Sequence, residues 1–316
     1  MAVRANSVLI KSLNRYQRLL SRINSGECIL LDGATGTEIE RRGVPQLENA
    51  WNGGGALSHP EILRDVHEDY LRLGVDVIIS NNFATHYHAL ADAGEAQLFE
   101  AYNRRGVELA TEARERQGRV GTVVAAGISY WSWSGNHPSL TDLCCAAEQQ
   151  VQVLADAGAD LLMLEMMIDI DRMQVLLDAA ATTELPVWIG LTTSVDDQGR
   201  VYLRNGEPLA DALAAIDDRS FDLINIMHTE VEEIDRSLDA LWSCWSGPVG
   251  VYAHSGRFHN NHLDFNSTIS PQAYAEAAMR WVERGVRVIG GCCGIEPRHI
   301  AHLADRIRIS SRDDSA

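Results

Sequence analysis

Residues 122–128 read Thr-Val-Val-Ala-Ala-Gly-Ile, a run that is apolar after its first residue and shows no polar–apolar alternation. Such runs are typical of parallel strands that are buried on both faces. Short apolar runs of this kind recur along the chain and are separated by amphipathic stretches. We interpret eight of them as strands, at residues 29–31, 75–79, 122–128, 161–164, 187–191, 223–226, 249–252 and 286–289.

Helical patterns fill the intervals between these strands. They lie at residues 60–73, 100–116, 143–157, 171–181, 209–217, 232–241 and 272–285. Eight strands that alternate with helices predict an α/β fold, a single (β/α)8 TIM barrel. A doubly wound sheet is the rival fold. However, residues 32–38 after the first strand contain only Gly-x-x-Gly, with neither a P-loop lysine nor a full dinucleotide-binding pattern.

We expect three segments. An amphipathic N-terminal extension occupies residues 1–24, and its leading helix has apolar positions at 7–23 that are broken by basic residues. This pattern does not read as a signal peptide. The barrel spans residues 25–309, and a polar tail follows at 310–316.

Charge and composition narrow the class of protein. The 316 residues include 27 Lys and Arg against 44 Asp and Glu, which gives a formal net charge of −17. Nucleic-acid binding needs clustered basic residues, so the acidic balance argues against a nucleic-acid partner. No apolar run reaches the roughly 18 residues of a membrane span, so the sequence also argues against a membrane protein. Six cysteines in a chain of this length, without an export signal, indicate thiols or metal ligands rather than disulfides. We therefore expect a cytoplasmic enzyme with small-molecule partners; no stretch of the sequence singles out a subunit interface.

The chemistry of such a barrel lies at the C-terminal ends of its strands. The most informative strand end is Gly-Gly-Cys-Cys-Gly at residues 290–294. Two adjacent thiols between glycines can face one zinc ion, which binds thiolates at about 2.3 Å. The other reading is that Cys292 and Cys293 are small buried hydrophobic residues. We favour a metal here, whereas the pair Cys144 and Cys145 falls in a helical pattern without glycines and is read as structural.

These motifs resemble a known family. Leu-Asp-Gly-Ala-Thr-Gly-Thr-Glu at residues 31–38, with Arg-Gly at 42–43, and the 290–294 motif are similar to the opening and closing signatures of the homocysteine S-methyltransferase family. Leu-Glu at 164–165, the strand at 186–191 and Asn-Gly-Glu-Pro-Leu at 205–209 follow in the expected order. The resemblance covers roughly residues 25–308.

The resemblance implies a (β/α)8 barrel with zinc on three cysteines, where a zinc-bound thiolate takes a methyl group from a sulfonium, ammonium or folate donor. Zinc deprotonates the thiol and positions it for in-line transfer. Asp32 and Glu165 match the family's carboxylates that bind the amino group of homocysteine.

The chain departs from the family at the first zinc ligand. No cysteine occurs in residues 224–230, and the register of the following helix places His228 at the ligand position. Imidazole is an accepted zinc ligand, so His228, Cys292 and Cys293 form the predicted site, with Cys244 as a weaker substitute for His228. Replacing one thiolate by imidazole changes the net charge of the site from −1 to zero. The loop at 253–257 also differs from the family, which puts the identity of the acceptor in question.

Further residues at the strand ends are candidates for substrate binding. Aromatic rings attract methylated cations. We therefore assign Trp51, Tyr130, Trp131 and Trp133 to the donor, and Asn82 and Thr85 to the lining of the pocket.

The prediction is a zinc-dependent S-methyltransferase that moves a methyl group from a sulfonium, betaine or similar small donor to a thiol, with homocysteine giving methionine. Two alternatives stay open. The same zinc site can activate water for hydrolysis, or the changed third ligand leaves a thiol- or metal-binding protein without catalysis.

Overall fold

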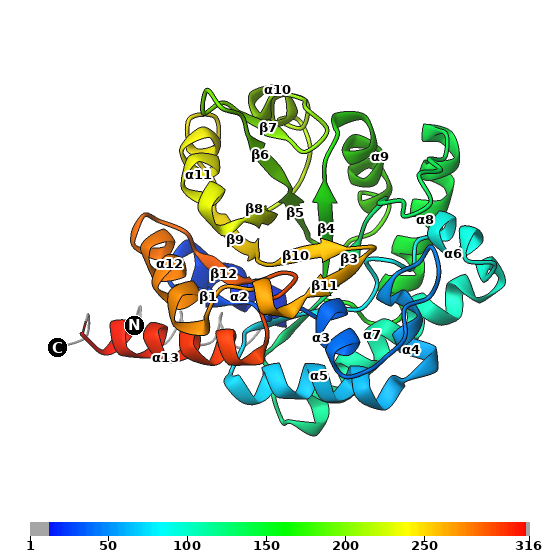
Figure 1. The fold of residues 1–316 in the computed structure, drawn as a ribbon, viewed down its shortest axis with the longest axis horizontal. Coiled ribbons are helices and arrows are strands. Elements are labelled where there is room, and N and C mark those ends of the chain that lie inside the picture. The colour runs from blue at the N-terminus through cyan, green and yellow to red at the C-terminus, as the bar shows by residue number, and fades with distance from the viewer. Residues whose placement is uncertain (1–12, 314–316) are drawn as a thin grey trace.

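The computed structural model describes residues 13–313, and these form an eight-stranded parallel sheet surrounded by helices (Figure 1). The strands of the sheet run in the spatial order β1-β12-β9-β8-β5-β4-β3-β2. They are β1 (Ile29–Leu30), β2 (Val77–Ser80), β3 (Val123–Ile128), β4 (Leu161–Met167), β5 (Val187–Leu191), β8 (Leu223–Glu230), β9 (Val249–His254) and β12 (Val288–Gly291).

The first strand closes this sheet into a barrel. On one side β1 pairs with the last strand, with Ile29 opposite Val288. On the other side Leu31 forms a parallel bridge with Val77 of β2, and the Asp32 N–H donates to the Val77 carbonyl at 3.1 Å. The predicted (β/α)8 barrel is therefore confirmed.

Each predicted strand and helix is present, with ends that differ by a few residues. The helices are α2 (Arg15–Asn24), α3 (Gly36–Arg41), α4 (Gly55–Ser58), α5 (Pro60–Leu73), α6 (Tyr87–Asp92), α7 (Phe99–Arg116), α8 (Leu140–Asp156), α9 (Ile170–Ala180), α10 (Leu209–Ala214), α11 (Ile234–Trp242), α12 (Pro271–Glu283) and α13 (Pro297–Asp313). Short 3₁₀ turns occur at η1 (Asn52–Gly54), η2 (Ala96–Leu98), η3 (Val231–Glu233) and η4 (Phe265–Ser267).

Two antiparallel hairpins follow barrel strands and were not predicted. One is β6 (Thr193–Val195) with β7 (Val201–Leu203), and the other is β10 (Arg257–His259) with β11 (His262–Asp264). The second hairpin crosses in front of the barrel strands in Figure 1. Their short, half-exposed strands lack the apolar runs by which the barrel strands were identified.

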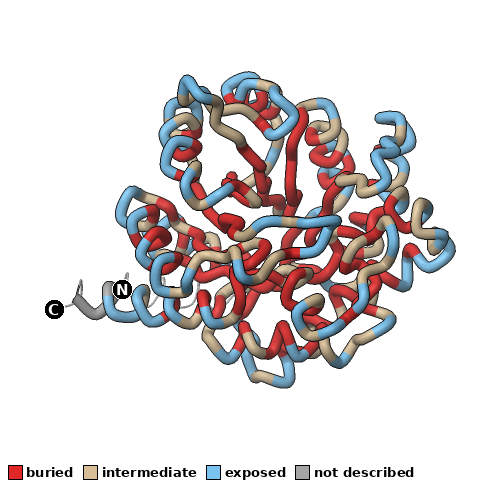
Figure 2. Tube along the Cα trace, in the orientation of Figure 1, coloured by how far each residue is buried: buried red, intermediate tan, exposed pale blue. Residues whose placement is uncertain are grey.

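The apolar runs are buried because the barrel interior covers one face of each strand and helices cover the other. All residues of β3, β4 and β5 are buried. Figure 2 shows the buried strands at the centre and the exposed surface on the outer helices and loops. The interior of the barrel is therefore a packed core, and its side chains are accessible to a ligand only at the two ends of the barrel.

The leading helix α2 seals the N-terminal end of the barrel. Its predicted range begins at residue 7, but residues 1–12 lie outside the described part of the chain. Asn14 caps the helix through a capping box with Gln17. The hydroxyl of Tyr16 donates to Asp222 at 2.6 Å and accepts a hydrogen bond from the indole N–H of Trp188 at 3.0 Å. The helix is thus fastened to the ends of two barrel strands.

The last helix α13 continues to Asp313, into the segment predicted as a polar tail at 310–316; residues 314–316 lie outside the described chain. None of the helices between residues 13 and 313 has the length and apolar character that a membrane crossing requires.

Replacing Tyr16 by phenylalanine tests the role of α2. Tyr16→Phe leaves the buried Trp188 N–H without its acceptor, so we expect the free energy of unfolding to fall by about 1–3 kcal/mol. The measurement is urea unfolding followed by circular dichroism. Tyr87→Phe is the matched control, because that ring is 40% exposed, and it should change stability by less than about 0.5 kcal/mol. Equal stability of the two variants would contradict the anchoring role.

Candidate active site

A pocket of about 270 Å³ opens at the C-terminal ends of the barrel strands. This is the end at which a (β/α)8 barrel carries its functional residues. The lining is contributed by segments that follow nearly every strand: Gly33, Ala34, Thr35, Gly36, Thr37, Trp51, Ile79, Ser80, Asn81, Phe83, Trp131, Trp133, Glu165, Met166, Arg204, Met227, His228, Tyr252, Phe258, Asn261, Gly291, Cys292 and Cys293.

His228, Cys292 and Cys293 converge on one wall of this pocket. Cys292 Sγ lies 3.6 Å from His228 Nδ1 and 3.8 Å from Cys293 Sγ. One donor atom from each of the three residues lies within 4.8 Å of the other two. Among residues 13–313, this is the single group of three or more His, Cys, Asp or Glu residues close enough to hold a metal ion.

The spacing of these atoms fits zinc. Two sulfur atoms that each lie 2.3 Å from one ion at the tetrahedral angle are about 3.8 Å apart. A sulfur and an imidazole nitrogen at 2.0–2.1 Å from the ion are about 3.6 Å apart. The separation of Cys292 from His228 and that of Cys292 from Cys293 agree with these values, and the third pair of donor atoms lies within 4.8 Å. A zinc ion held by these three residues would have one coordination position open to a substrate.

A β-bulge aims His228 at the cysteines. The register between β8 and β9 shifts between Met227 and Glu230, and His228 there adopts the left-handed φ of 45°. Non-glycine residues seldom adopt a positive φ, and such strain concentrates at functional sites. A second bulge at the end of β4 gives Met166 a φ of 59°, and its neighbour Glu165 lines the same pocket.

The His228 imidazole is held in its neutral form. Its removal from water lowers its pKa well below the usual value, and electrostatic interaction with His254 and Arg204 lowers the pKa further. A neutral imidazole offers the lone pair that a metal ion needs. Without a metal ion, the interaction with the Cys292 sulfur and burial raise the pKa of the Cys293 thiol well above its ordinary value. A bound metal ion reverses this preference because it stabilises thiolates.

Backbone hydrogen bonds fix the segment that carries the cysteines. The Cys292 N–H donates to the Ala253 carbonyl at 2.9 Å, and the Ser255 N–H donates to the Cys293 carbonyl at 3.0 Å. Gly294 has a φ of +79°, and a Cβ at this position would collide with the Ser255 carbonyl oxygen. Only glycine fits here, as the sequence motif indicates.

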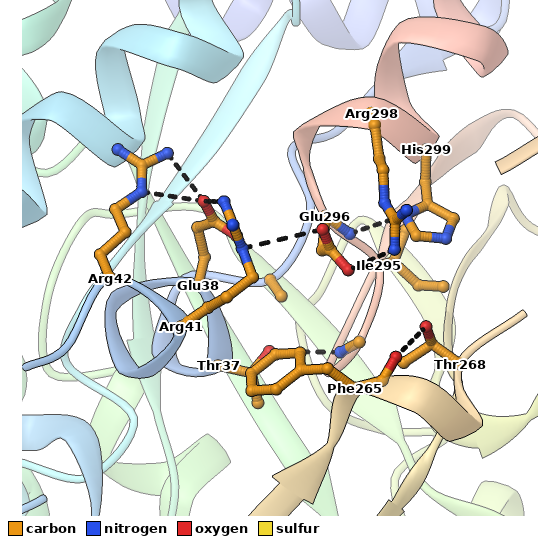
Figure 3. A network of polar contacts seen from close by, with 12 residues as sticks. Thr37, Glu38, Arg41, Arg42, Phe265, Thr268, Ile295, Glu296, Arg298 and His299 are labelled. Carbon is orange, nitrogen blue, oxygen red and sulfur yellow. Dashed lines mark hydrogen bonds and ion pairs between the residues drawn. The ribbon is translucent and has the colours of Figure 1, made fainter. Parts of the chain in front are cut away.

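The same segment is tied to the start of the barrel. The Gly294 N–H donates to the Thr37 hydroxyl at 3.2 Å. Behind this contact, Arg41 and Arg42 converge on the fully buried Glu38, and Arg41 also faces Glu296 at 3.7 Å (Figure 3). Helix α3 and the start of α13 therefore brace the cysteine segment from outside.

Two carboxyl groups lie at the floor of the pocket. Burial raises the pKa of Glu165 to about 8, and its carboxylate accepts no hydrogen bond from the described residues. Asp32 lies beneath the lining, where burial first and the charge of Glu165 second raise its pKa well above the ordinary value. One Asp32 oxygen accepts the Ile79 N–H at 2.8 Å, while the other is buried without a partner.

An aromatic wall stands opposite the floor. Trp51 stacks on Trp133 with ring centroids 6.1 Å apart, and Phe83 packs edge-on against both. Trp131 lines the pocket beside them, with the guanidinium of Arg204 6.0 Å from its ring centroid. Three of the four aromatic residues that the sequence analysis assigned to the donor thus lie in the wall of the pocket.

Tyr130 is the fourth aromatic residue, and the prediction that it contacts the donor is corrected by its position. Its ring is buried beneath the wall, and its hydroxyl accepts the N–H groups of Ile168 and Asp169 at 2.8 and 3.1 Å. The residue therefore fixes the loop after β4 and does not line the pocket.

Asn82 and Thr85 also lie outside the pocket. Their side chains hydrogen-bond to Asn103 of α7, with the Asn82 amide donating to the Asn103 carbonyl at 3.0 Å and the Thr85 hydroxyl donating to the Asn103 side chain at 2.8 Å. This buried polar network joins the end of β2 to α7, because buried polar groups must find partners. The neighbouring Asn81 faces the pocket instead.

Sequence reasoning missed several lining residues. Tyr252 and Met227 sit at the ends of predicted strands, so the strand-end rule could have found them. Arg204, Phe258 and Asn261 come from the two unpredicted hairpins or the residues beside them, and no sequence signal pointed to them. The alternative ligand Cys244 is exposed at the end of α11 and hydrogen-bonds to Ser243.

Comparison with known proteins agrees with this arrangement. The sequence profile of a family described as homocysteine S-methyltransferase matches residues 29–307. The homocysteine S-methyltransferase YbgG of Bacillus subtilis is 28% identical over 300 residues, covering 87% of this chain and 93% of that protein. The homocysteine S-methyltransferase of Escherichia coli is 28% identical over 322 residues, covering 93% and 100%.

A solved structure is also similar to this chain over nearly its whole length. The metallated form of the homocysteine methyltransferase MmuM from Escherichia coli matches with a TM-score of 0.75 and 26% identity, covering 93% of this chain and 100% of that one. A family profile that spans the whole barrel, together with relatives and a solved structure that match over nearly their full lengths, shows that the chain belongs to the homocysteine S-methyltransferase family and is a methyltransferase.

Proposed function

We propose that this chain is a zinc-dependent S-methyltransferase that moves a methyl group from a sulfonium, betaine or similar small donor to a thiol, with homocysteine giving methionine. The observation that carries the proposal is the convergence of His228, Cys292 and Cys293, whose donor atoms lie within 4.8 Å of one another in the same pocket as Glu165. The names of the relatives support homocysteine as the acceptor, and the metallated relative supports a metal.

His228, Cys292 and Cys293 would hold the zinc ion. When bound, zinc lowers the pKa of an acceptor thiol so that its sulfur is present as the nucleophilic thiolate. The site with one imidazole and two thiolates has a net charge of zero. A neutral site acidifies the acceptor thiol more strongly than a site of charge −1, but it leaves the sulfur less nucleophilic. We infer that the donor supplies a good leaving group.

The floor of the pocket suits the amino group of the acceptor. The buried Tyr252 hydroxyl and one Asp32 oxygen have no partner among the described residues, and Glu165 is likewise free of hydrogen bonds. Burial and then the charges of Glu165, Cys292 and Asp32 raise the pKa of Tyr252, so these groups lie near one another. An ammonium group has three N–H donors and would satisfy all three acceptors.

The aromatic wall suits the donor. The faces of Trp51, Trp131 and Trp133 attract a methylated cation. In the transfer, the acceptor sulfur forms a bond to the methyl carbon while the bond from that carbon to the donor heteroatom breaks. The electron pair stays on the donor, which leaves as a neutral thioether or amine, and the thiol proton goes to water. The residues contribute positioning and charge rather than proton transfer to the methyl group.

Metal content tests the ligand set. Wild-type protein prepared under reducing conditions with zinc supplied should bind one zinc ion per chain. His228→Ala and Cys292→Ala should each weaken zinc binding by at least about 100-fold, because loss of a ligand costs more than loss of an outer partner. Competition with a chromogenic chelator measures the affinity.

Cys145→Ala is the matched control for the cysteine variants, because Cys145 is exposed on α8 and should leave zinc binding unchanged. Full retention of zinc by His228→Ala would remove that residue as a ligand. Wild-type protein without zinc would overturn the metal mechanism.

Glu165→Gln tests the acceptor site through pH. With a pKa near 8, the Glu165 carboxyl is mostly protonated at pH 7 in the empty pocket, and an ammonium group beside it favours ionisation. Acceptor binding therefore releases a proton, and affinity should rise with pH, by up to about tenfold per unit below pH 8, and level off above it.

A thiol without an amino group serves as the reference, because it shares the pH dependence of thiol ionisation. In wild type, the preference for homocysteine over this thiol, measured as the ratio of their KM values, should increase from about pH 6 to 8. In Glu165→Gln the preference should be smaller and independent of pH. An unchanged preference in this variant would argue against Glu165 as the amino-group ligand.

A further inference from the structure

We propose that His254 is a positioning residue for the metal site: its ring holds the His228 imidazole in the orientation in which Nδ1 faces Cys292. The inference rests on the proposed function, because it concerns how the candidate histidine ligand is held. Its evidence is the contact between the two imidazole rings, the burial of His254 and the register of the two strands that carry them.

The His228 ring needs support from a neighbour. A histidine that binds zinc usually donates its second ring N–H to a carboxylate or a carbonyl group, and that hydrogen bond fixes the ring. The one hydrogen-bond contact of the His228 side chain with a described residue is that of Nδ1 with Cys292 Sγ, at 3.6 Å. The torsion that turns an imidazole about its Cβ–Cγ bond is broad. Another contact must therefore set the plane of the His228 ring.

His254 supplies that contact. The centroids of the His228 and His254 rings lie 4.7 Å apart at an interplanar angle of 45°, which is the shortest separation of two rings among the described residues. His254 is 5% exposed. The Phe258 ring, from hairpin strand β10, stacks on His254 with centroids 5.7 Å apart at 15°. Packing against Phe258 therefore restrains the ring that His228 contacts.

The strand register brings the two histidines together. Met227 of β8 pairs with Tyr252 of β9. The next pair is Glu230 with His254, so β8 has one more residue than β9 between these pairs, and His228 lies in this bulge. Glu230 also approaches the His254 side chain, with Oε1 3.3 Å from Nε2. The residue that closes the bulge therefore also restrains the ring that supports the ligand.

An imidazole ligand needs this support more than a thiolate does. A thiolate sulfur has lone pairs in several directions, whereas an imidazole nitrogen binds a metal ion along one lone pair in the plane of the ring. His228 and His254 lie in the two segments at which the sequence departs from the family, residues 224–230 and 253–257. The residue that supplies the imidazole and the residue that sets its plane are thus in contact.

A double-mutant cycle tests the inference through zinc affinity, which is measured by competition with a chromogenic chelator. His254→Asn removes the ring but keeps a side chain that can hydrogen-bond to Glu230. It should weaken zinc binding by about 10- to 100-fold, because loss of an outer partner of a ligand has an effect of this size. In His228→Cys the third ligand is a thiolate without a ring to orient. In that background, His254→Asn should change zinc affinity by less than about threefold.

Two further variants separate the ring contact from a general loss of structure. His254→Phe supplies a ring without the contact to Glu230, so it should recover most of the zinc affinity that His254→Asn loses. His67→Asn is the matched control for the loss of a buried histidine, because His67 is fully buried on α5 and does not line the pocket. It should bind zinc as wild type does.

Equal loss of zinc affinity from His254→Asn in the two backgrounds would overturn the inference, because the variant would then disturb the strand ends rather than the imidazole. Affinity as low in His254→Phe as in His254→Asn would also overturn it. Methyl transfer to homocysteine is measured separately. Coupling between His254 and His228 in a protein that transfers no methyl group would support His254 and defeat the proposed function. Methyl transfer by a protein whose zinc affinity does not depend on His254 would overturn this inference alone.

Discussion

Closure of the barrel by β1 is the constraint on which the site depends. This short strand pairs with β12 on one side and bridges to β2 on the other, so the first and last segments of the barrel become neighbours. The Thr37 hydroxyl can then accept the Gly294 N–H, and the cysteine segment is braced from both ends. Because every strand of the barrel sheet is parallel, residues from distant parts of the sequence meet at one end of the barrel. The pairings of β12 with β9 and of β9 with β8 set the position of Cys292 and Cys293 relative to His228, and the closure braces the cysteine segment from its other side.

The electrostatics of the pocket follow from what is buried there. At the floor of the pocket, burial raises the pKa of Glu165, and burial together with the charge of Glu165 raises the pKa of Asp32. The candidate metal ligands line the same pocket. A bound cationic group would stabilise the ionised carboxylates, and a metal ion would stabilise the thiolates. In the proposed zinc site, an imidazole in place of a third thiolate would lower the negative charge by one, and Arg204 is the one basic residue among the described residues that line the pocket, histidine apart.

The sequence predicted the parts of the molecule that are set by local patterns. Unalternating apolar runs identified every barrel strand, and the strand-end rule led to Glu165 and to the residues of the candidate metal site. The prediction from sequence failed where tertiary packing decides the direction of a side chain. Asn82 and Asn81 are adjacent, yet one turns to α7 and the other to the pocket. Arg204 lies on a hairpin without an apolar signature, so its place in the pocket is visible only in three dimensions.

The central claim is that an imidazole and two thiolates hold a zinc ion whose fourth position receives the acceptor sulfur. X-ray absorption at the zinc edge tests it most directly, because sulfur at about 2.3 Å and nitrogen or oxygen at about 2.0–2.2 Å are resolved as separate shells. The account predicts two sulfur and two lighter neighbours in the resting enzyme, and three sulfur and one lighter neighbour after homocysteine is added. A resting site with three or four sulfur neighbours, or a spectrum that homocysteine does not change, would contradict it.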